Sequence, residues 1–328
     1  MKKKILFTAL FFLIAVLSAC APQSVAVEQD IEDQSAEAEQ AQVDEPAQSE
    51  TITYIVDGLG REVILPETVI SIVSLAPSNT ELLFAVGAGD KVVGRDSFSD
   101  YPAEALELPD IGGSFSEYNL EAIVALQPDL VLAAEINTPE LVQSLEDLGL
   151  TVFYLNNPTN LEGMYEMLRT VAALSSHTAQ AEELIASLQE RVQAVTDKLA
   201  QATQTPSVFY ELDASDPLKP FTPGPGTFYT TLISLAGGRN IGAELKSAWA
   251  QISLEELLVQ DPDFILLGDA MWGTTSESVA ERTGWEQLTA VQEGRVLPFD
   301  DNLLSRPGPR QVEGLEALAN LLHPDLFK

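Results

Sequence analysis

The stretch "NLEAIVALQPDLVLA" (residues 119–133) occurs a second time in the chain as "SLEELLVQDPDFILL" (residues 253–267). In both copies a Leu-Glu pair opens an apolar segment, a Pro-Asp pair stands eight and nine residues after that leucine, and apolar residues follow. Proline cannot continue a helix and favours extended geometry in the residue before it. Each copy therefore predicts a helix, a stop and a strand buried in a parallel sheet.

A second pair of segments extends this repeat. Residues 71–94, "SIVSLAPSNTELLFAVGAGDKVVG", predict strand, polar loop, helix, glycine turn and strand, and residues 207–242 repeat the start of that order with a longer loop. Because both repeats occur in the same order, they indicate two similar α/β units in tandem, although any two strand–helix units share such features. The predicted strands are 70–75, 92–95, 130–134 and 152–155 in the first unit, and 208–212, 264–267 and 296–299 in the second.

A long amphipathic helix is predicted between the two units, at 178–202. It contains no glycine or proline, so it is expected to be stiff. Its apolar residues recur with helical spacing, at Ile185, Leu188, Val192, Val195 and Leu199. The predicted fold is α/β, with two Rossmann-like lobes that have parallel sheets and are joined by one long backbone helix. The expected boundaries are 51–177 for the N-terminal lobe, 178–204 for the interlobe helix and 205–328 for the C-terminal lobe.

The first nineteen residues read as an export signal. A basic start at 1–4 precedes an apolar run at 5–17, which is shorter than the roughly 20 residues that cross a bilayer. The signal ends in "LSAC", which resembles the lipobox of bacterial lipoproteins, where the cysteine is lipidated and becomes the first mature residue. Cys20 is the only cysteine in the chain, and this fits lipid attachment better than a chance cysteine after an ordinary signal.

Residues 20–50 are predicted to form a disordered acidic tether. They hold nine acidic residues and no lysine or arginine, and they are rich in Gln, Ala and Ser. Without the three lysines of the signal and these nine acids, the formal charge changes from −33 to −27. A surface this acidic repels nucleic acid and anionic lipid headgroups, so we expect no nucleic-acid partner and a membrane contact made through the lipid.

Several segments together resemble the substrate-binding lipoproteins of the ABC importers for cobalamin, haem and ferric siderophores, and most closely the cobalamin-binding proteins. They are the 71–94 segment, "DYP" at 100–102, the first repeat copy, "FTPGPG" at 221–226, "GRVLPFDDNLLSRPGPR" at 294–310 and the mid-chain helix. The resemblance covers 51–328. It implies a ligand held between two lobes with little closure, and delivery to an ABC permease dimer with its ATPase subunits.

The loops expected at the carboxyl ends of the strands are rich in aromatic residues, although the whole chain is only 7% aromatic. Ligands of open α/β sheets bind at these ends, and aromatic faces suit a large, flat, partly apolar ring system. Core packing is the alternative for each aromatic residue. The aromatic candidates are Phe98, Tyr101, Phe115, Phe221, Phe228, Tyr229, Trp249 and Trp272.

Resemblance to the cobalamin-binding subgroup implies a narrower set of pocket residues. They are Tyr101, Phe115, Phe221, Trp249, Asp301 and Arg306. The chain departs from that subgroup at Ala134 and Glu135, where the subgroup often has an aromatic residue. The predicted ligand is a corrinoid that is transported and does not serve as a cofactor.

Haem or a ferric siderophore is the alternative ligand. Haem is usually held by Tyr, His or Met, and His177 and His323 are expected away from the cleft. Tyrosines that could still bind haem iron are Tyr101, Tyr118 and Tyr229. An anionic siderophore needs clustered arginine or lysine, and the loops offer chiefly Arg306, with Arg310 and Lys219 nearby. Sparse positive charge favours a neutral or cationic ligand.

Glu121 and Glu255 occupy matching positions in the repeated segments 119–133 and 253–267, two residues after the expected N-caps Asn119 and Ser253. A helix N-terminus favours a carboxylate there, so both residues could simply stabilise their own helices. The family resemblance implies instead that one glutamate on each lobe pairs with arginines of the permease. Glu256 is the second candidate in the C-terminal lobe.

A surface-anchored hydrolase is the alternative from another class of function. Its nucleophile elbow would need Gly-x-Ser-x-Gly with a histidine partner, and "SLAPSNT" lacks the glycines. "GPGT" at 224–227 lacks the lysine of a phosphate-binding loop. We therefore expect no enzyme and no metal site, and a location outside the cytoplasmic membrane, anchored to its outer face by lipidated Cys20.

Overall fold

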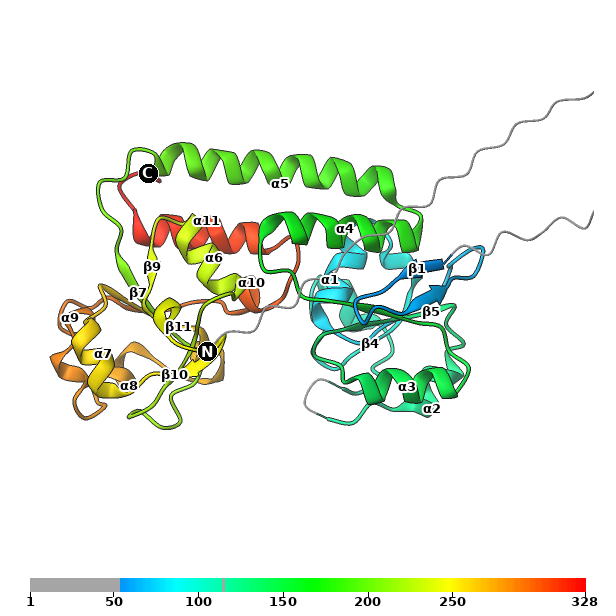
Figure 1. Cartoon of the computed structure of the whole chain (residues 1–328), viewed down its shortest axis with the longest axis horizontal. Helices are drawn as coiled ribbons and strands as arrows, with labels where there is room; N and C mark the ends of the chain where they lie inside the picture. The colour runs from blue at the N-terminus through cyan, green and yellow to red at the C-terminus, as the bar shows by residue number, and fades with distance from the viewer. Residues whose placement is uncertain (1–53, 114–115) are drawn as a thin grey trace, which may run out of the picture. The chain divides into compact units, whose positions relative to one another are not determined.

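The computed structural model describes residues 54–113 and 116–328, so the predictions for Cys20, the signal, the tether and Phe115 lie outside the described residues. Two four-stranded parallel sheets organise the described chain (Figure 1). The N-terminal lobe holds β3 (Ile72–Ser74), β4 (Val92–Arg95), β5 (Leu130–Ala134) and β6 (Val152–Leu155), and the C-terminal lobe holds β7 (Ser207–Glu211), β9 (Arg239–Asn240), β11 (Phe264–Leu267) and β12 (Val296–Pro298). The strand orders are β4-β3-β5-β6 and β9-β7-β11-β12. Both sheets therefore have the second strand, the first, the third and the fourth in the same sequence, so the repeat in the chain is also a repeat in topology.

Helices cover both faces of each sheet. The N-terminal lobe has α1 (Pro77–Ala85), α2 (Leu120–Ala125), α3 (Pro139–Asp147) and α4 (Leu161–Ser175), and the interlobe helix is α5 (Thr178–Leu199). The C-terminal lobe has α6 (Phe228–Leu235), α7 (Leu254–Gln260), α8 (Ser276–Ala280), α9 (Thr289–Gln292), α10 (Asn302–Ser305) and α11 (Gln311–Leu322). Short 3₁₀ turns occur at η1 (Gly89–Lys91), η2 (Ala103–Glu107), η3 (Ile241–Glu244), η4 (Gly268–Trp272) and η5 (Trp285–Gln287). Two antiparallel pairs complete the fold, β1 (Tyr54–Val56) with β2 (Glu62–Ile64) and β8 (Phe221–Pro223) with β10 (Trp249–Gln251).

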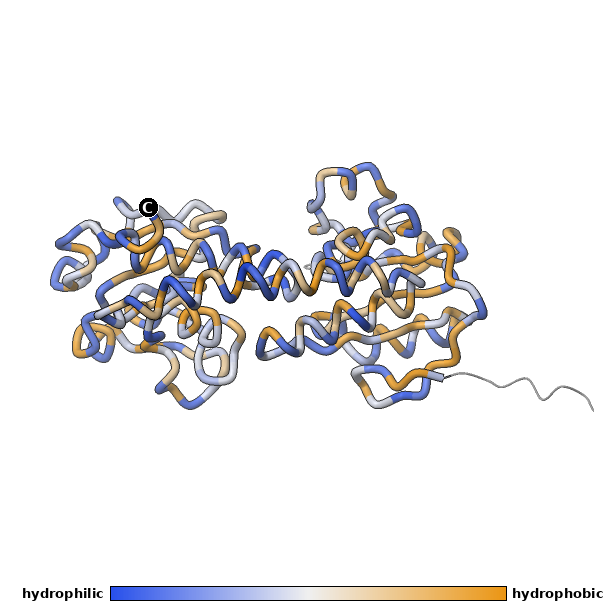
Figure 2. The backbone as a smooth tube through the Cα atoms, turned by 90° about the horizontal axis from the view of Figure 1, so that it is seen from above, coloured by the Kyte–Doolittle hydropathy of each residue, from blue (hydrophilic) through white to orange (hydrophobic). Residues whose placement is uncertain are grey.

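Residues that alternate along each central strand belong to different hydrophobic clusters. Leu130 and Leu132 of β5 face a cluster that also contains residues of the C-terminal lobe, whereas Val131 and Ala133 face a cluster of the N-terminal lobe alone. Such strands are buried on both sides, as the apolar runs predict. Figure 2 shows hydrophobic stretches of backbone in both lobes.

Helix α5 belongs to the core that the two lobes share. Its buried residues Ala181, Ile185, Leu188 and Val195 pack in the same cluster as apolar side chains of α4 and α11, and Figure 1 shows α5 running alongside both helices. Between Leu188 and Val195 on the same face, Arg191 donates two hydrogen bonds to Glu316 of α11, at 2.9 and 2.7 Å. The predicted helix begins where expected and ends three residues before 202.

The repeated Pro-Asp pair has the same structural role in both lobes. Asp129 accepts hydrogen bonds from the backbone N–H and the hydroxyl of Ser71, both at 2.9 Å, and its own N–H donates to the Ser71 hydroxyl at 3.0 Å. Asp263 makes the equivalent three bonds with Ser207, at 2.7, 2.7 and 3.0 Å. In each lobe the aspartate before the third strand thus fixes the start of the first strand.

The turn before each Pro-Asp pair and the start of each repeated helix also match. Gln127 and Asp261 stand immediately before the prolines and both have positive φ, 47° and 38°, a conformation that costs non-glycine residues free energy. The N-caps are confirmed, because the side chains of Asn119 and Ser253 accept hydrogen bonds from the third residue of α2 and α7. The repeat therefore specifies backbone geometry as well as hydrophobic pattern.

We predict that Asp129→Ala and Asp263→Ala each lower the free energy of unfolding by about 2 kcal/mol, because each change leaves backbone and hydroxyl donors without their acceptor. The N–H of Ile70 and the hydroxyl of Ser71 lower the pKa of the Asp129 carboxyl. Its contribution should therefore be complete above about pH 4 and be lost as the pH falls through the lowered value. Urea titrations at pH 7 and pH 3 measure both effects.

Asp90→Ala is the control for these two changes, since Asp90 is an exposed aspartate of η1. It should change the stability by no more than about 0.5 kcal/mol. If Asp129→Ala at pH 7 behaved like this control, the bond to Ser71 would not stabilise the fold.

Candidate functional site

Buried hydroxyl groups gather where β3 and β4 of the N-terminal lobe end. The Thr80 hydroxyl lies 2.8 Å from that of Ser74 and 2.8 Å from that of Ser99, and Ser99 in turn donates to the carboxylate of Asp96. All four side chains are buried. Their network fixes the loop that follows β4, because Asp96 also accepts from the backbone N–H of Phe98 at 2.9 Å.

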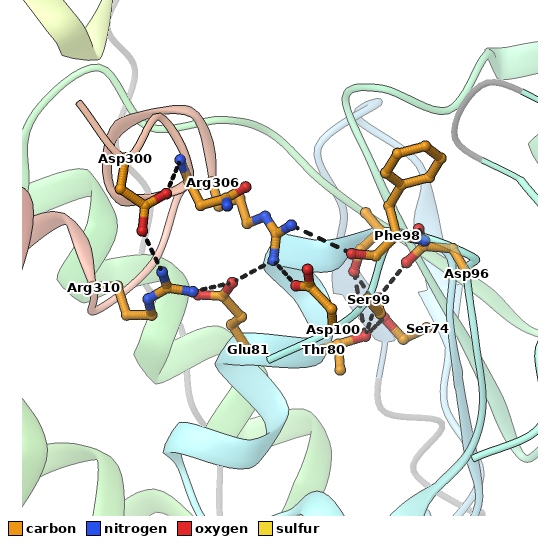
Figure 3. Close-up of polar contacts among 12 residues, drawn as sticks. Ser74, Thr80, Glu81, Asp96, Phe98, Ser99, Asp100, Asp300, Arg306 and Arg310 are labelled. Carbon is orange, nitrogen blue, oxygen red and sulfur yellow. Dashed lines mark hydrogen bonds and ion pairs between the residues drawn. The ribbon is translucent and has the colours of Figure 1, made fainter. Parts of the chain in front are cut away.

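Two arginines of the C-terminal lobe reach across to this loop and to α1 (Figure 3). Arg306 donates to Glu81 at 3.0 Å and to Asp100 at 2.6 Å through one nitrogen, and through the other to the carbonyl of Phe98 at 3.3 Å. Arg310 donates to the same Glu81 oxygen at 3.0 Å. Arg310 is also paired with Asp300, at 3.7 Å. We call Glu81, Asp100, Asp300, Arg306 and Arg310 the interlobe clamp.

The centre of the interlobe clamp is buried. The side chains of Arg306, Arg310 and Glu81 are 10%, 11% and 2% exposed. Burial raises the pKa of the Glu81 carboxyl, and Arg310 and Arg306 oppose that rise. Two guanidinium groups face three carboxylates, so the clamp carries no surplus positive charge.

An aromatic surface lies on the C-terminal lobe. Phe221 and Trp249 stand on the paired strands β8 and β10, on the same face of that pair. They are 42% and 59% exposed, which is unusual for large apolar side chains. Tyr229 packs against Trp249 with the two rings nearly perpendicular, at 87°, and their centroids 5.8 Å apart. We call Phe221, Tyr229 and Trp249 the aromatic wall.

Asp301 anchors the aromatic wall from below. One of its oxygens accepts hydrogen bonds from the hydroxyls of Tyr210 and Tyr229, at 2.8 and 2.9 Å. Burial raises the pKa of Asp301, although the two tyrosine hydroxyls oppose the rise. Burial and the neighbouring Asp301 raise the pKa of Tyr229 well above its ordinary value. Asp301 follows Asp300 in the chain, so the residue that supports the wall is the neighbour of a clamp carboxylate.

The structure brings together some of the predicted ligand-binding residues and separates others. Phe221, Trp249 and Asp301 belong to the aromatic wall and its support, and Tyr101 lies under the guanidinium of Arg310, 4.1 Å from the ring centroid. Arg306 is engaged in the clamp. Of the remaining predicted residues, Trp272 is exposed at the end of η4, and Phe228 is buried in the core shared by both lobes.

Glu81 and the role of Arg310 were missed by sequence reasoning. Glu81 stands in the apolar helix segment "TELLFA" and is the charged residue of α1. A single carboxylate in an apolar, buried helix requires a positively charged or hydrogen-bonding partner, so the sequence did indicate that Glu81 has one. The identity of that partner could not be read, because Arg306 and Arg310 are 225 and 229 residues away in the chain.

A cavity of about 460 Å³ lies on the helical side of the clamp. Its walls include Phe84 of α1, Leu184 and Leu188 of α5, and Pro309 before α11. Glu81 and Arg310 line it as well. Tyr101 and Pro102 of the loop that follows β4 also line it, so helical side chains and one of the loops at the strand ends share this cavity.

Two α/β lobes of identical strand order, one helix in their common core and side chains that bridge them define a two-lobed solute-binding protein. A family model described as "periplasmic binding protein" matches residues 72–303, and the chain belongs to this family. The resemblance and the α/β fold expected from the sequence are thereby confirmed.

Three relatives illustrate the range of similar proteins. An uncharacterized ABC transporter substrate-binding lipoprotein of Bacillus subtilis, YvrC, is 30% identical over 295 residues, which cover 88% of this chain and 91% of that protein. A cobalamin-binding protein of Halobacterium salinarum is 34% identical over 259 residues, covering 77% of this chain and 69% of that protein. The solved structure of the periplasmic heme-binding protein RhuT from Roseiflexus has a TM-score of 0.70 and 27% identity, and covers 78% of this chain and 98% of that chain.

Membership of this family establishes the general role. The chain is an extracytoplasmic substrate-binding protein of an ABC transporter, and the family binds solutes and is not an enzyme family. Within residues 54–113 and 116–328, no helix combines the length and the apolar character needed to span a bilayer.

Proposed function

We propose that this protein captures a corrinoid against the aromatic wall and delivers it to an ABC permease. The observation that carries the proposal is the exposure of Phe221 and Trp249 on one face of β8 and β10, backed by Tyr229. Large exposed aromatic side chains on a rigid pair of strands suit a broad ring system with apolar faces. The cobalamin-binding relative from Halobacterium supports the same ligand class.

The charge around the wall also favours a ligand without strong negative charge. Arg306 and Arg310 follow Asp301, the support of the wall, in the chain, and both are already paired with carboxylates of the clamp. Asp301 and Asp300 add negative charge next to the wall. An anionic chelate would meet no unpaired guanidinium among these residues, whereas a neutral corrinoid needs none.

Haem is the second candidate, because the RhuT structure is that of a haem-binding protein. Two of the three tyrosines that could hold iron are engaged, since the Tyr118 hydroxyl donates to the carbonyl of Leu75 at 2.7 Å and that of Tyr229 donates to Asp301. The raised pKa of Tyr229 opposes the tyrosinate that iron prefers. Tyr101, which is exposed, is therefore the tyrosine that haem would use.

We predict that Trp249→Ala weakens cyanocobalamin binding by about 1–3 kcal/mol, because the indole loses the apolar area it buries against the ligand. Titrations of the wild type with cyanocobalamin, haemin and a ferric siderophore, followed by calorimetry, measure the affinities. Tyr54→Ala is the control, since Tyr54 is similarly exposed, at 53%, on the remote strand β1. An unchanged affinity would show that Trp249 is not part of the site. A wild-type protein that binds haemin but no corrinoid would refute the proposed corrinoid ligand.

We propose further that Glu121 and Glu255 dock the two lobes onto the permease. Both are exposed and occupy the second position of α2 and α7, in equivalent places of the two repeated units. A permease of two equivalent subunits presents the same contact twice, and the repeat presents the same carboxylate twice. Stabilisation of the two helix ends is the competing explanation.

We predict that Glu121→Ala combined with Glu255→Ala abolishes transport and the stimulation of ATP hydrolysis by the permease, while ligand affinity changes less than about twofold. Glu140→Ala combined with Glu277→Ala is the matched control, since these exposed glutamates occupy the second position of α3 and α8, outside the repeat. Uptake that persists in the first double variant, measured in reconstituted vesicles, would refute docking through these residues.

We propose, finally, that lipidated Cys20 anchors the protein to the outer face of the cytoplasmic membrane through the tether at 20–50, after removal of residues 1–19. The "LSAC" pattern and the lipoprotein name of the Bacillus relative support this. Cys20→Ser should leave unprocessed precursor or released protein in place of a form labelled by radioactive palmitate. Labelling that survives the change rules the anchor out, and Ser24→Cys in the same variant tests whether position matters.

A further inference from the structure

We propose that Glu81 is a specificity-determining residue, which excludes anionic chelates by keeping Arg306 and Arg310 from reaching a ligand. Glu81 does not contact the ligand in this proposal and acts through the two arginines. The inference rests on the proposed site at the aromatic wall. It concerns the charge that the site accepts, and it does not depend on which neutral ligand is carried.

One oxygen of Glu81 receives both arginines. Arg306 and Arg310 donate to it at 3.0 Å each, and Figure 3 shows the carboxylate between the two guanidinium groups. The other acceptors of the clamp, Asp100 and Asp300, bind the arginines more weakly, because their side chains are 55% and 53% exposed. Exposed carboxylates are solvated and can turn away, so Glu81 is the acceptor that fixes both arginines.

Loss of the Glu81 charge would leave two guanidinium groups in a dry place without their common counterion. Buried charges are stable only when they are paired and hydrogen-bonded. A carboxylate of an incoming ligand would then supply the missing pair, and arginine binds carboxylates with two parallel hydrogen bonds. The guanidinium groups of Arg306 and Arg310, which now connect the two lobes, would then bind an anionic ligand.

The arginines are placed where such a receptor would act on the proposed ligand. Arg310 covers the ring of Tyr101 at 4.1 Å, and its partner Asp300 precedes Asp301, the support of the aromatic wall. Other cations near the wall in the chain, Lys219, Arg239 and Lys246, are exposed, and the change at Glu81 leaves them as they are. Their contribution is therefore the same in wild type and variant.

The test uses Glu81→Gln, which keeps the shape and removes the charge. Haemin carries two propionates, haemin dimethyl ester carries none, and cyanocobalamin is electrically neutral. We expect the variant to bind haemin at least about tenfold more tightly than the wild type does, the ratio that one added hydrogen bond to a charged group provides. Affinities for the ester and for cyanocobalamin should change less than about threefold. The gain for haemin should shrink as salt is raised.

Glu211→Gln is the matched control. Glu211 is also a buried glutamate held by an arginine, with two bonds from Arg282 at 2.6 and 2.8 Å, but it belongs to the interior of the C-terminal lobe. Burial raises the pKa of Glu211 to about 7, so all titrations are made at pH 8, where its carboxyl is ionised. This control should lose stability without any change in the ratio of haemin to ester affinity.

Asp100→Asn is the second variant, needed if Glu81→Gln does not fold, and it should shift the same ratio in the same direction by a smaller factor. A folded Glu81→Gln that binds haemin no better than wild type overturns the inference, as does an equal gain for haemin and its ester, or the same gain in Glu211→Gln. If Glu81→Gln does not fold, no shift in Asp100→Asn overturns it. Wild type that binds no cyanocobalamin refutes the proposed ligand, while the comparison of haemin affinities still decides the role of Glu81.

Discussion

The two lobes are tied by two interactions of different physical character, and the rest of the structure depends on this double connection. One is the apolar cluster in which α5 packs with residues of both lobes, including Leu168 of α4 and Leu315 of α11. The other is the interlobe clamp, where Glu81 receives both arginines of the opposite lobe. Apolar packing is non-directional, whereas a buried ion pair requires one geometry. The first therefore holds the lobes together, and the second specifies how the loops beside the aromatic wall meet.

The fold was readable from the sequence because its signals are local. The Pro-Asp pairs mark where β5 and β11 begin, and four of the seven predicted strands have the predicted bounds. The strand predicted at 70–75 is shorter, Ile72–Ser74, and Ser71, which bonds to Asp129, lies just before it. The antiparallel pairs at β1–β2 and β8–β10 were not predicted, since these short strands are partly exposed and lack the buried apolar run that marks a strand of a parallel sheet.

The candidate site was only partly readable, because its residues are joined by contacts across the chain. Phe221 and Trp249 were found by their aromatic character and by family resemblance, but their common face follows from the pairing of β8 with β10. Phe228 is also aromatic but lies in the core, so residue type alone does not distinguish an exposed binding residue from a core residue. Arg306 was expected to face a ligand, and that role stays a prediction. Its present partners come from α1 and the loop after β4, which no local pattern could supply.

The repeat is kept in some parts of the molecule and lost in others, and the difference agrees with the proposed function. Strand order, the aspartate–serine bonds and the capped helices that carry Glu121 and Glu255 are the same in both lobes. The loops at the strand ends differ, with buried hydroxyls around Thr80 in one lobe and the aromatic wall in the other. A partner of two equivalent subunits requires the same contact residues on both lobes. A ligand with two different sides requires different contact residues on each lobe. Selection on the proposed function would therefore preserve the symmetry of the helices at 120–125 and 254–260 and remove it from the loops around the site.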